Sequence, residues 1–307
     1  MSTTESMGEF VGSTGVEVLH PDTPEEALAL ARDIAESSGR RIDTPVRNLF
    51  VRDFSNQGAA PLTVLIGRGG RGGGVAVKLY LALLWRCSAP PYDTAVSARK
   101  WAALLGLEDP NHRGARRVTD ALRILEDEGL VTVTRQRGEA STITVREESG
   151  KAEYTPPYEL WNSEASKEKE NLYFWVPTTL WTKGHIQSMS APALAMLLVC
   201  LANDIGATGK PLWWSTKIFP EQYGLSPATR ARGTRELVGR RLLHVKKQLV
   251  SESKKGNSSF SRERVRNLYH LINDAHRVEP DATSKKAKGL TPIALPPPPG
   301  THGTKTK

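Results

Sequence analysis

One order of sequence patterns occurs twice in this chain of 307 residues, and it constrains the fold more than any other feature. Each copy has three helical patterns followed by two stretches in which apolar and polar residues alternate. In the first copy, residues 75–148, an apolar helix begins at Val75, Ser97 is placed to cap a second helix, and a third helix runs from about Gly114 to Glu128. The apolar face of the third helix consists of Val118, Ala121, Leu122 and Leu125. Such a repeat predicts two small modules of helices, each with a hairpin.

The second copy lies in residues 173–273, after a polar connector at residues 149–172. Ser190 is placed to cap its first, apolar helix, and Ser226 with Pro227 opens its third helix. When the second copy is aligned with the first at an offset of 112 residues, apolar residues coincide near the C-terminal ends of the two third helices. In the middle of these helices they do not coincide. The remaining predicted elements are a short helix at 177–181, a strand at 212–214, a second helix at 215–223, and hairpin strands at 243–250 and 264–271.

The third helix and hairpin of the first copy, RRVTDALRILEDEGLV followed by an alternating strand, resemble those of winged helix-turn-helix DNA-binding proteins over about 75 residues. The resemblance implies that the third helix enters the major groove and that the hairpin, or wing, lies along the phosphates. The paired architecture is similar to that of plasmid and phage replication initiators, and the segment FWVPTTLWTKGHIQSMSAPALAMLLVCLA resembles the one that leads into their winged helix. The fold class expected is mainly α with small β-hairpin wings (α+β), as two tandem winged-helix domains.

The rest of the chain flanks these modules. Residues 1–22 are predicted to be disordered, and residues 23–74 to contain a helix capped at Thr23, a short strand at residues 62–66 and a glycine-rich linker. The tail, residues 274–307, is basic and proline-rich and is predicted to be disordered.

The linker contains a formal match to the dinucleotide-binding motif G-x-G-x-x-G at Gly67, Gly69 and Gly72. In a dinucleotide fold such a turn joins a strand to a helix, and a second parallel strand then ends in an acidic residue near position 92. A proline-rich loop, CSAPPYDT, stands there instead, and Asp93 ends no predicted strand. A flexible basic linker is favoured, and a nucleotide-cofactor enzyme is kept as a minor alternative.

The positive charge is concentrated in the second module. Residues 173–273 hold 15 Lys and Arg against 5 Asp and Glu, whereas residues 75–148 hold 11 against 10. Since the whole chain has a net charge of +9, this one module accounts for the excess and indicates a polyanionic partner. A basic surface that serves solubility is the alternative.

The exposed side of each third helix and its wing supplies the candidate DNA contacts, because arginine suits a bidentate bond to guanine and aspartate accepts from a cytosine amine. In the first module the candidates are Arg116, Arg117, Thr119, Asp120 and Arg123 on the helix, and Arg135 and Arg137 on the wing. In the second module they are Thr229, Arg230, Arg232, Arg235 and Arg240 on the helix, and Lys246, Lys247, Lys254, Lys255 and Arg262 on the wing. The alternative for the first helix is a solvated face with ion pairs such as Arg116 with Asp120 and Arg123 with Asp127.

Five tryptophans fall where winged-helix cores need bulk, which favours packing over the stacking of single-stranded bases. They are Trp85, Trp101, Trp181, Trp213 and Trp214.

The sequence contains no pattern that indicates a disulfide framework, a metal site or a catalytic site. The two cysteines lie within apolar helical patterns and the seven histidines are scattered, so neither a disulfide framework nor a metal site is expected. No spacing indicates a catalytic triad or a carboxylate pair, and we expect a protein that is not an enzyme, with no catalytic residues and no cofactor.

The expected function is sequence-specific binding of double-stranded DNA by a transcription regulator, and a plasmid- or phage-type replication initiator is the main alternative. Two modules in one chain read an asymmetric site without dimerisation, so a homo-oligomer is compatible with the architecture but not required. A protein-interaction scaffold that docks through Glu126, Asp127 and Glu128 is a further alternative. The longest apolar stretch, residues 191–202, is too short to span a membrane and no secretory signal is found, so a cytoplasmic, nucleoid-associated location is expected.

Overall fold

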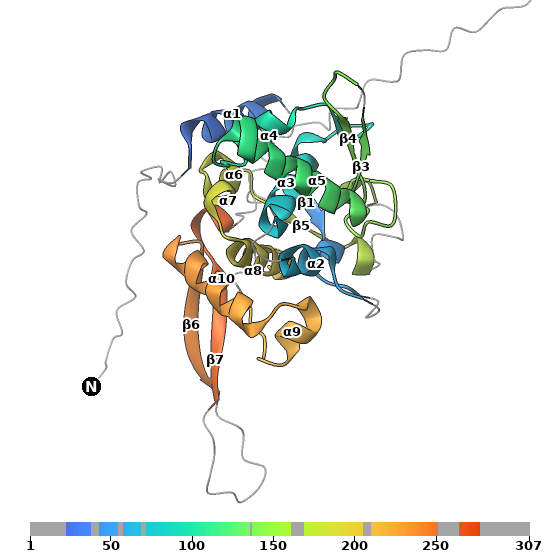
Figure 1. Cartoon of the computed structure of the whole chain (residues 1–307). Coiled ribbons are helices and arrows are strands. Elements are labelled where there is room, and N and C mark those ends of the chain that lie inside the picture. The colour runs from blue at the N-terminus through green and yellow to red at the C-terminus, as the bar shows by residue number, and fades with distance from the viewer. Residues whose placement is uncertain are drawn as a thin grey trace, which may run out of the picture. The chain divides into compact units, whose positions relative to one another are not determined.

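A computed structural model describes residues 23–37, 43–54, 58–68, 72–135, 137–160, 169–204, 210–250 and 264–276. Within these ranges the fold is mixed α/β, with helices and small antiparallel sheets (Figure 1). Residues 1–22 and 277–307, which make up most of the segments predicted to be disordered, lie outside the described residues. The first residues of the predicted disordered tail, 274–276, are folded instead: Asn273–Ala275 forms a 3-10 turn, Ala275 is buried and Asp274 forms an ion pair with Lys183 (2.7 Å).

The first copy of the repeated pattern folds into helices and one small sheet. In chain order its elements are α3 (Gly73–Arg86), β2 (Asp93–Thr94), α4 (Ala98–Leu104), a π-helical turn (Pro110–Gly114), α5 (Ala115–Asp127), β3 (Val131–Thr134) and β4 (Thr142–Val145). All four apolar residues predicted for the inner face of α5 are buried. Ser97 caps α4 as expected, since its hydroxyl accepts a hydrogen bond from the backbone nitrogen of Lys100 (3.4 Å).

Strand β2 corrects the prediction of a loop around Asp93. Both of its residues pair with β4, and the backbone nitrogen of Val145 donates to the carbonyl oxygen of Tyr92 (3.0 Å). The sheet has the order β2-β4-β3. Two residues are too few to show alternation, so only the pairing with β4 reveals this strand.

The second copy repeats the same order. Its elements are α8 (Ala191–Asn203), α9 (Ile218–Tyr223), α10 (Pro227–Gly239), β6 (Leu243–Val250) and β7 (Arg264–Leu271). The strand predicted at residues 212–214 is reduced to one bridge, in which Leu212 and Tyr269 exchange backbone hydrogen bonds of 2.9 and 2.8 Å. β7 therefore lies between Leu212 and β6, as β4 lies between β2 and β3.

Close packing of α10 against α8 explains a glycine in the middle of α10. A Cβ atom at Gly233 would lie 2.3 Å from the carbonyl oxygen of Pro192, which is closer than real contacts allow. Gly233 lowers the helix propensity of α10, but it lets the two helices approach.

The two copies pack against each other through their first helices, α3 and α8. Trp85 of α3 stacks on Trp181, with ring centroids 5.4 Å apart. The ammonium group of Lys78 donates a hydrogen bond to the carbonyl oxygen of Gln187 (2.7 Å). One hydrophobic core therefore extends through both copies.

The described residues between 23 and 67 contribute to this core rather than forming a separate flank. The helices and strands before the first copy are α1 (Glu25–Ser37), β1 (Thr44–Arg47) and α2 (Pro61–Gly67). The second copy begins with β5 (Tyr173–Val176), α6 (Thr179–Thr182) and α7 (His185–Ser188), which precede α8. β1 pairs antiparallel with β5, and α1 packs against α4 and α6. The hydroxyl of Thr23, expected to cap α1, instead donates to the carbonyl oxygen of Gly184 (2.9 Å).

The strand predicted at residues 62–66 is wrong, because this segment forms α2. Pro61 stands in its first turn, and Leu62 and Leu65, three residues apart, are both buried. A short apolar run suits a strand or a buried helix equally well, and packing against α3 and α8 selects the helix.

The glycine run at residues 67–74 lies between two helices, α2 and α3. Gly72 has φ +124°, and a Cβ atom at Gly73 would lie 1.9 Å from the carbonyl oxygen of Leu65. Residues 69–71 lie outside the described residues. Since a helix precedes the turn, the strand-to-helix context that the dinucleotide motif requires is not formed.

A buried ion pair joins β1 to the start of the connector. Arg47 contacts Glu148 at 2.8 Å, with side-chain exposures of 2% and 0%, and also donates to the carbonyl oxygen of Thr155 (2.6 Å). Tyr154 is buried as well. Part of the polar connector, at Tyr154 and Thr155, therefore packs against the core.

Candidate nucleic-acid interface

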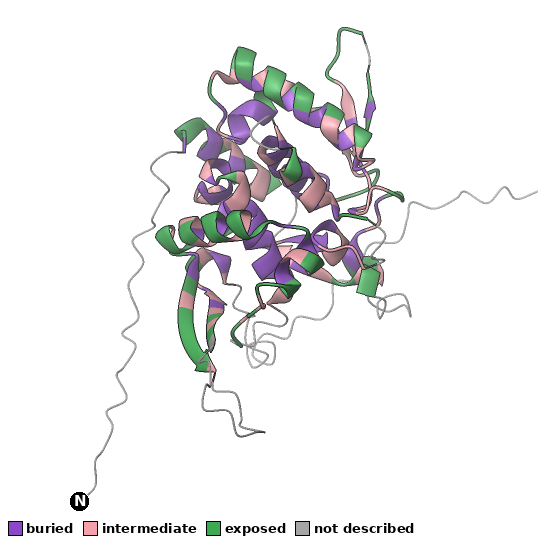
Figure 2. Cartoon of the chain, turned by 60° about the horizontal axis from the view of Figure 1, so that its bottom comes forward, coloured by how far each residue is buried: buried purple, intermediate pink, exposed green. Residues whose placement is uncertain are grey.

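The candidate residues on α5 lie together on its exposed side. Figure 2 shows exposed residues along the outer sides of α5 and α10. The exposed candidates on α5 are Arg116, Arg117, Thr119, Asp120 and Arg123. Arg123 forms an ion pair with Asp120 (3.2 Å) that is largely open to solvent. Because such exposed ion pairs are weak, Arg123 can leave Asp120 and bind a phosphate at little cost in free energy.

The wing of the first copy presents two exposed arginines, of which Arg135 is held in an ion pair. Arg135 contacts both carboxylate oxygens of Glu126, at 2.7 and 3.3 Å. This hydrogen bonding lowers the pKa of Glu126. Arg137 is exposed.

The acidic surface suggested for protein docking is largely engaged within the chain. Glu126 binds Arg135, and Glu128 forms an ion pair with Arg68 (2.6 Å). Two of the three acids thus stabilise the junction of α5 with its neighbours, which weakens the scaffold alternative.

On α10, two of the predicted arginines lie on the exposed side of the helix. Arg232 and Arg235 are exposed, and Arg232 bonds only locally, to the carbonyl oxygen of Ala228 (3.4 Å). Thr229 is half-buried in the first turn, where its hydroxyl bonds to that of the capping residue Ser226 (2.9 Å).

Arg230 points inward. Its guanidinium donates to the carbonyl oxygens of Trp214 (3.2 Å) and Ser215 (3.4 Å) and to the hydroxyl of Tyr269 (3.0 Å). It also lies 4.5 Å from the ring centroid of Phe219. The spacing that placed Arg230 among the DNA contacts did not reveal this aromatic site, and we leave Arg230 out of the interface.

Arg240 is engaged in the same way at the other end of α10. It binds Glu236 (3.0 Å) and donates to the carbonyl oxygen of Ser188 (2.8 Å), and its side chain is 11% exposed. Burial acts to raise the pKa of Glu236, but hydrogen bonds from Ser190 and the charge of Arg240 outweigh it and lower the pKa. The i, i+4 spacing of Glu236 and Arg240 was the available sequence signal for this pair.

A buried lysine lies near this cluster. Burial, followed by repulsion from Arg240, lowers the pKa of Lys78 on α3 from 10.5 to about 8. Arg117 of α5 acts on Lys78 in the same direction. The first helix of the first copy is therefore electrostatically coupled to the third helices of both copies.

The wing of the second copy continues the positive charge of α10. Lys246 and Lys247 are exposed on β6, which extends away from the helices with β7 (Figure 1). Lys254, Lys255 and Arg262 lie outside the described residues.

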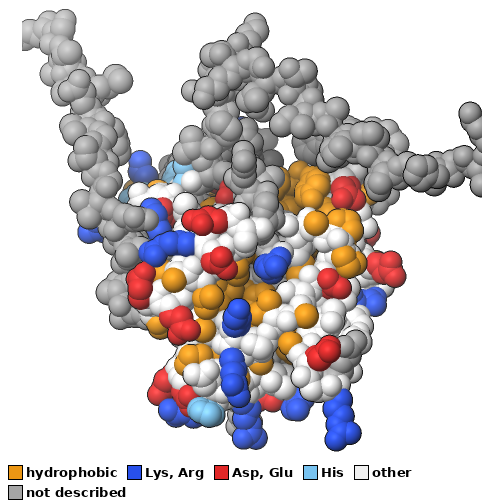
Figure 3. All heavy atoms as spheres, turned by 90° about the horizontal axis from the view of Figure 1, so that it is seen from above, with side chains coloured by type: hydrophobic (Ala, Val, Ile, Leu, Met, Phe, Trp, Pro, Cys, Tyr) orange, Lys and Arg blue, Asp and Glu red, His pale blue; other side chains and the backbone are white. Residues whose placement is uncertain are grey.

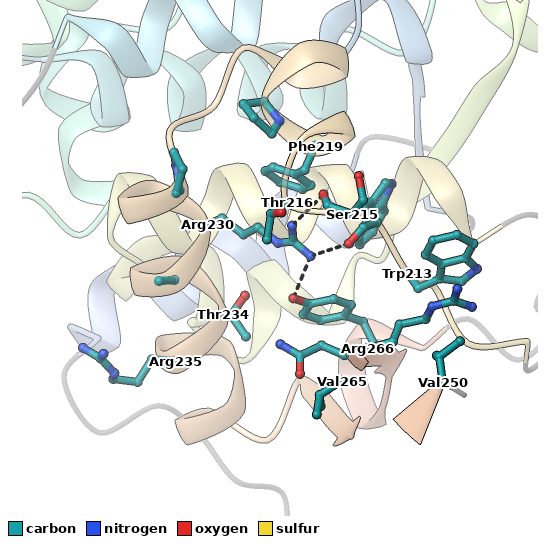
Figure 4. Close-up of a pocket in the computed structure, with 16 residues that line it drawn as sticks. Trp213, Ser215, Thr216, Phe219, Arg230, Thr234, Arg235, Val250, Val265 and Arg266 are labelled. Atoms are coloured by element: carbon teal, nitrogen blue, oxygen red, sulfur yellow. Dashed lines mark hydrogen bonds between the residues drawn. The ribbon is translucent and has the colours of Figure 1, made fainter. Parts of the chain in front are cut away.

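A groove of about 900 Å³ separates α10 from this wing. Figure 4 shows Thr234 and Arg235 of α10 on one side and Val265 and Arg266 of β7 on the other. The hydroxyl oxygen of Thr234 is shielded from solvent and has no hydrogen-bond partner among the described residues.

The tryptophans divide into core residues and one exception. Trp85, Trp101 and Trp181 are at most 1% exposed, as expected for core packing. Trp214 packs against Phe219, Tyr223 and Tyr269, with ring centroids 5.6 to 6.1 Å apart. Trp213 is 47% exposed, and the guanidinium of Arg266 lies 3.7 Å from its ring centroid.

Other faces of the molecule carry mixed charge. Figure 3 shows acidic and basic side chains interspersed on the face seen from above, the side on which α1 and α4 lie in Figure 1. This agrees with the near balance of charge in residues 75–148, where 11 Lys and Arg face 10 Asp and Glu. No similar balance holds in residues 173–273.

Within the described ranges, no group of three or more His, Cys, Asp or Glu side chains is arranged to hold a metal ion, and no helix is long and apolar enough for a membrane span. Comparison of the chain with protein-family models, with curated protein sequences and with solved structures gave no match.

Proposed function

We propose that this chain binds double-stranded DNA through two winged-helix modules, residues 75–148 and 173–273, and acts as a transcription regulator. One observation carries the proposal: both copies have the order helix, extended segment, helix, helix, hairpin. The extended segment is strand β2 in the first copy and the single bridge at Leu212 in the second, and in both it pairs with the last strand of the hairpin. A winged helix with this order places its third helix in the major groove and its hairpin against the backbone.

The proposed contacts are the exposed cations of the third helices and wings. In the first module they are Arg116, Arg117, Arg123 and Arg137, with Thr119 and Asp120 between them on the helix. In the second module they are Arg232, Arg235, Lys246 and Lys247. Arg135, Arg230 and Arg240 are excluded because their guanidinium groups bind within the protein.

The second module supplies most of the electrostatic affinity. Its exposed cations stand in a segment with 15 Lys and Arg against 5 Asp and Glu. Bringing such a segment to a duplex releases condensed counterions, which favours binding and relieves the repulsion among the cations.

A salt series tests the proposal. The affinity of the full chain is measured by fluorescence anisotropy on a pool of duplexes of about 30 base pairs, long enough for two half-sites. Neutralising six to eight phosphates gives a slope of log K against log salt of about −5 to −7. A flat response would exclude DNA as the partner and leave a protein partner.

A replication initiator is the second candidate, favoured by one observation. The two modules of one chain are packed together through α3 and α8, so a single molecule presents two reading surfaces in a fixed relation. A footprint on DNA that flanks the gene separates the two roles, because iterated repeats indicate initiation and overlap with a promoter indicates regulation.

A further inference from the structure

The groove between α10 and the wing has a composition that duplex binding does not explain. Its lining contains four aromatic residues and three arginines and no acidic residue. A duplex offers phosphates to arginines, but its bases are stacked inside and offer no free face to an aromatic side chain. An unpaired strand offers both phosphates and base faces.

Among the aromatic residues that line the groove, Trp213 is the one that does not pack into the core. Its neighbour Trp214 fills the space among Phe219, Tyr223 and Tyr269, so the core of the second copy does not need a second indole there. Trp213 remains 47% exposed at the edge of the groove, beside the guanidinium of Arg266 (Figure 4).

The wing adds apolar surface at the same place. Leu249 and Val265 are direct cross-strand partners on β6 and β7, and they are 67% and 58% exposed. Val265 and Val250 line the groove. Exposed aliphatic side chains beside cations suit contact with bases better than contact with phosphates alone.

The polar groups of the groove are placed for a phosphodiester strand. Arg266 lines the groove from β7 and Arg235 lies at its rim on α10, where Figure 4 shows its side chain turned outward. The shielded hydroxyl of Thr234 on the same helix has no partner in the described part of the chain. A volume of about 900 Å³ leaves room for a base together with its phosphates.

We propose that this groove binds a segment of single-stranded DNA, with one base stacked on the exposed part of Trp213 and the flanking phosphates held by Arg235 and Arg266. The proposal rests on the proposed function in taking α10 as the DNA-facing helix. A protein with this site holds an unpaired strand next to the duplex that it reads.

Two ligands and two variants test this site in the full chain. Anisotropy is measured with labelled oligo(dT) and with a duplex of the same length, for Trp213→Leu and for Arg232→Ala. Because stacking on one aromatic side chain accounts for a large part of single-strand affinity, we expect Trp213→Leu to weaken oligo(dT) binding about tenfold and to change duplex binding less than twofold. Arg232 does not line the groove, so Arg232→Ala is expected to weaken duplex binding and to leave oligo(dT) binding nearly unchanged.

Controls separate stacking from charge and from misfolding. An abasic oligonucleotide of equal length, which keeps the phosphates, is expected to bind native protein and Trp213→Leu equally, and Trp213→Phe is expected to restore most of the oligo(dT) affinity. Duplex binding without oligo(dT) binding would overturn the groove proposal and leave the proposed function intact. Equal losses on both ligands for Trp213→Leu would overturn it too, whereas oligo(dT) binding without duplex binding would contradict the proposed function alone.

Discussion

Arg230 of α10 donates a hydrogen bond to the hydroxyl of Tyr269 on β7 (3.0 Å), and this contact ties the third helix of the second copy to its hairpin. The equivalent position in the first copy, 112 residues earlier, is Val118, which is fully buried in the hydrophobic core. The second copy thus replaces a core valine by an arginine within a ring of aromatic side chains, with Phe219 at 4.5 Å and Tyr269 at 5.4 Å. The two sequences therefore differ at this position because the same place in the fold is filled by an aliphatic side chain in the first copy and by an arginine among aromatic rings in the second.

Arg230→Met is expected to destabilise the protein. The change removes hydrogen bonds to the carbonyl oxygens of Trp214 and Ser215 and to the hydroxyl of Tyr269. The carbonyl oxygen of Ser215 keeps a second donor, the backbone nitrogen of Phe219 (3.3 Å). We expect a loss of about 2–4 kcal/mol in the free energy of unfolding, measured by urea denaturation. Arg232→Met on the exposed side of the same helix is the matched control, and a similar loss in both variants would contradict an inward role for Arg230.

Stability is expected to depend on pH through Lys78. Its pKa is about 8 in the folded protein and 10.5 in the unfolded chain, so the unfolded chain binds more protons between these values and stability rises with pH through this window. Lys78→Met removes the free-energy cost of burying the charged ammonium group of Lys78. We expect its stability advantage over the native protein to shrink by about 2 kcal/mol between pH 7.5 and 9.5, as followed by urea denaturation at each pH. An advantage that does not change with pH would show that Lys78 titrates normally.

Two glycines of α10 are expected to respond in opposite directions to alanine. At Gly233 a Cβ atom would lie 2.3 Å from the carbonyl oxygen of Pro192, so Gly233→Ala should cost about 1–3 kcal/mol by forcing α10 away from α8. At Gly239 nothing lies within 4 Å of an added Cβ, so Gly239→Ala should gain about 0.5–1 kcal/mol of helix propensity. Thermal unfolding followed by circular dichroism compares the two, and a Gly233→Ala protein as stable as the native one would refute the close approach.

Local patterns predicted the parts of the fold in which periodicity is strong. The inner face of α5, the caps Ser97 and Ser226 and the strands at 243–250 and 264–271 follow the sequence directly. The apolar run at residues 62–66 could not be assigned in this way, because a run of that length has no period and packing against two helices decides its form.

Pairing between distant segments could not be predicted. β1 and β5 lie about 130 residues apart in the chain, and β2 has only two residues. The local sequence of these strands does not indicate which strand each one pairs with. The same limit applies to the site, although charge identified α10 and its wing as the candidate surface. Arg230 and Arg232 have the same side chain, and only the tertiary environment separates the partly buried Arg230 from the exposed Arg232.

If the exposed arginines of the third helices contact DNA phosphates or bases, the double variant Arg232→Ala/Arg235→Ala must bind DNA with a weaker salt dependence than the native protein. Removing two phosphate contacts should reduce the slope of log K against log salt by about 2, together with a loss of affinity at every salt concentration. Arg32→Ala removes a partly exposed arginine of α1, outside the proposed interface, and should leave the slope unchanged. Identical slopes for the native protein and the double variant would contradict the account.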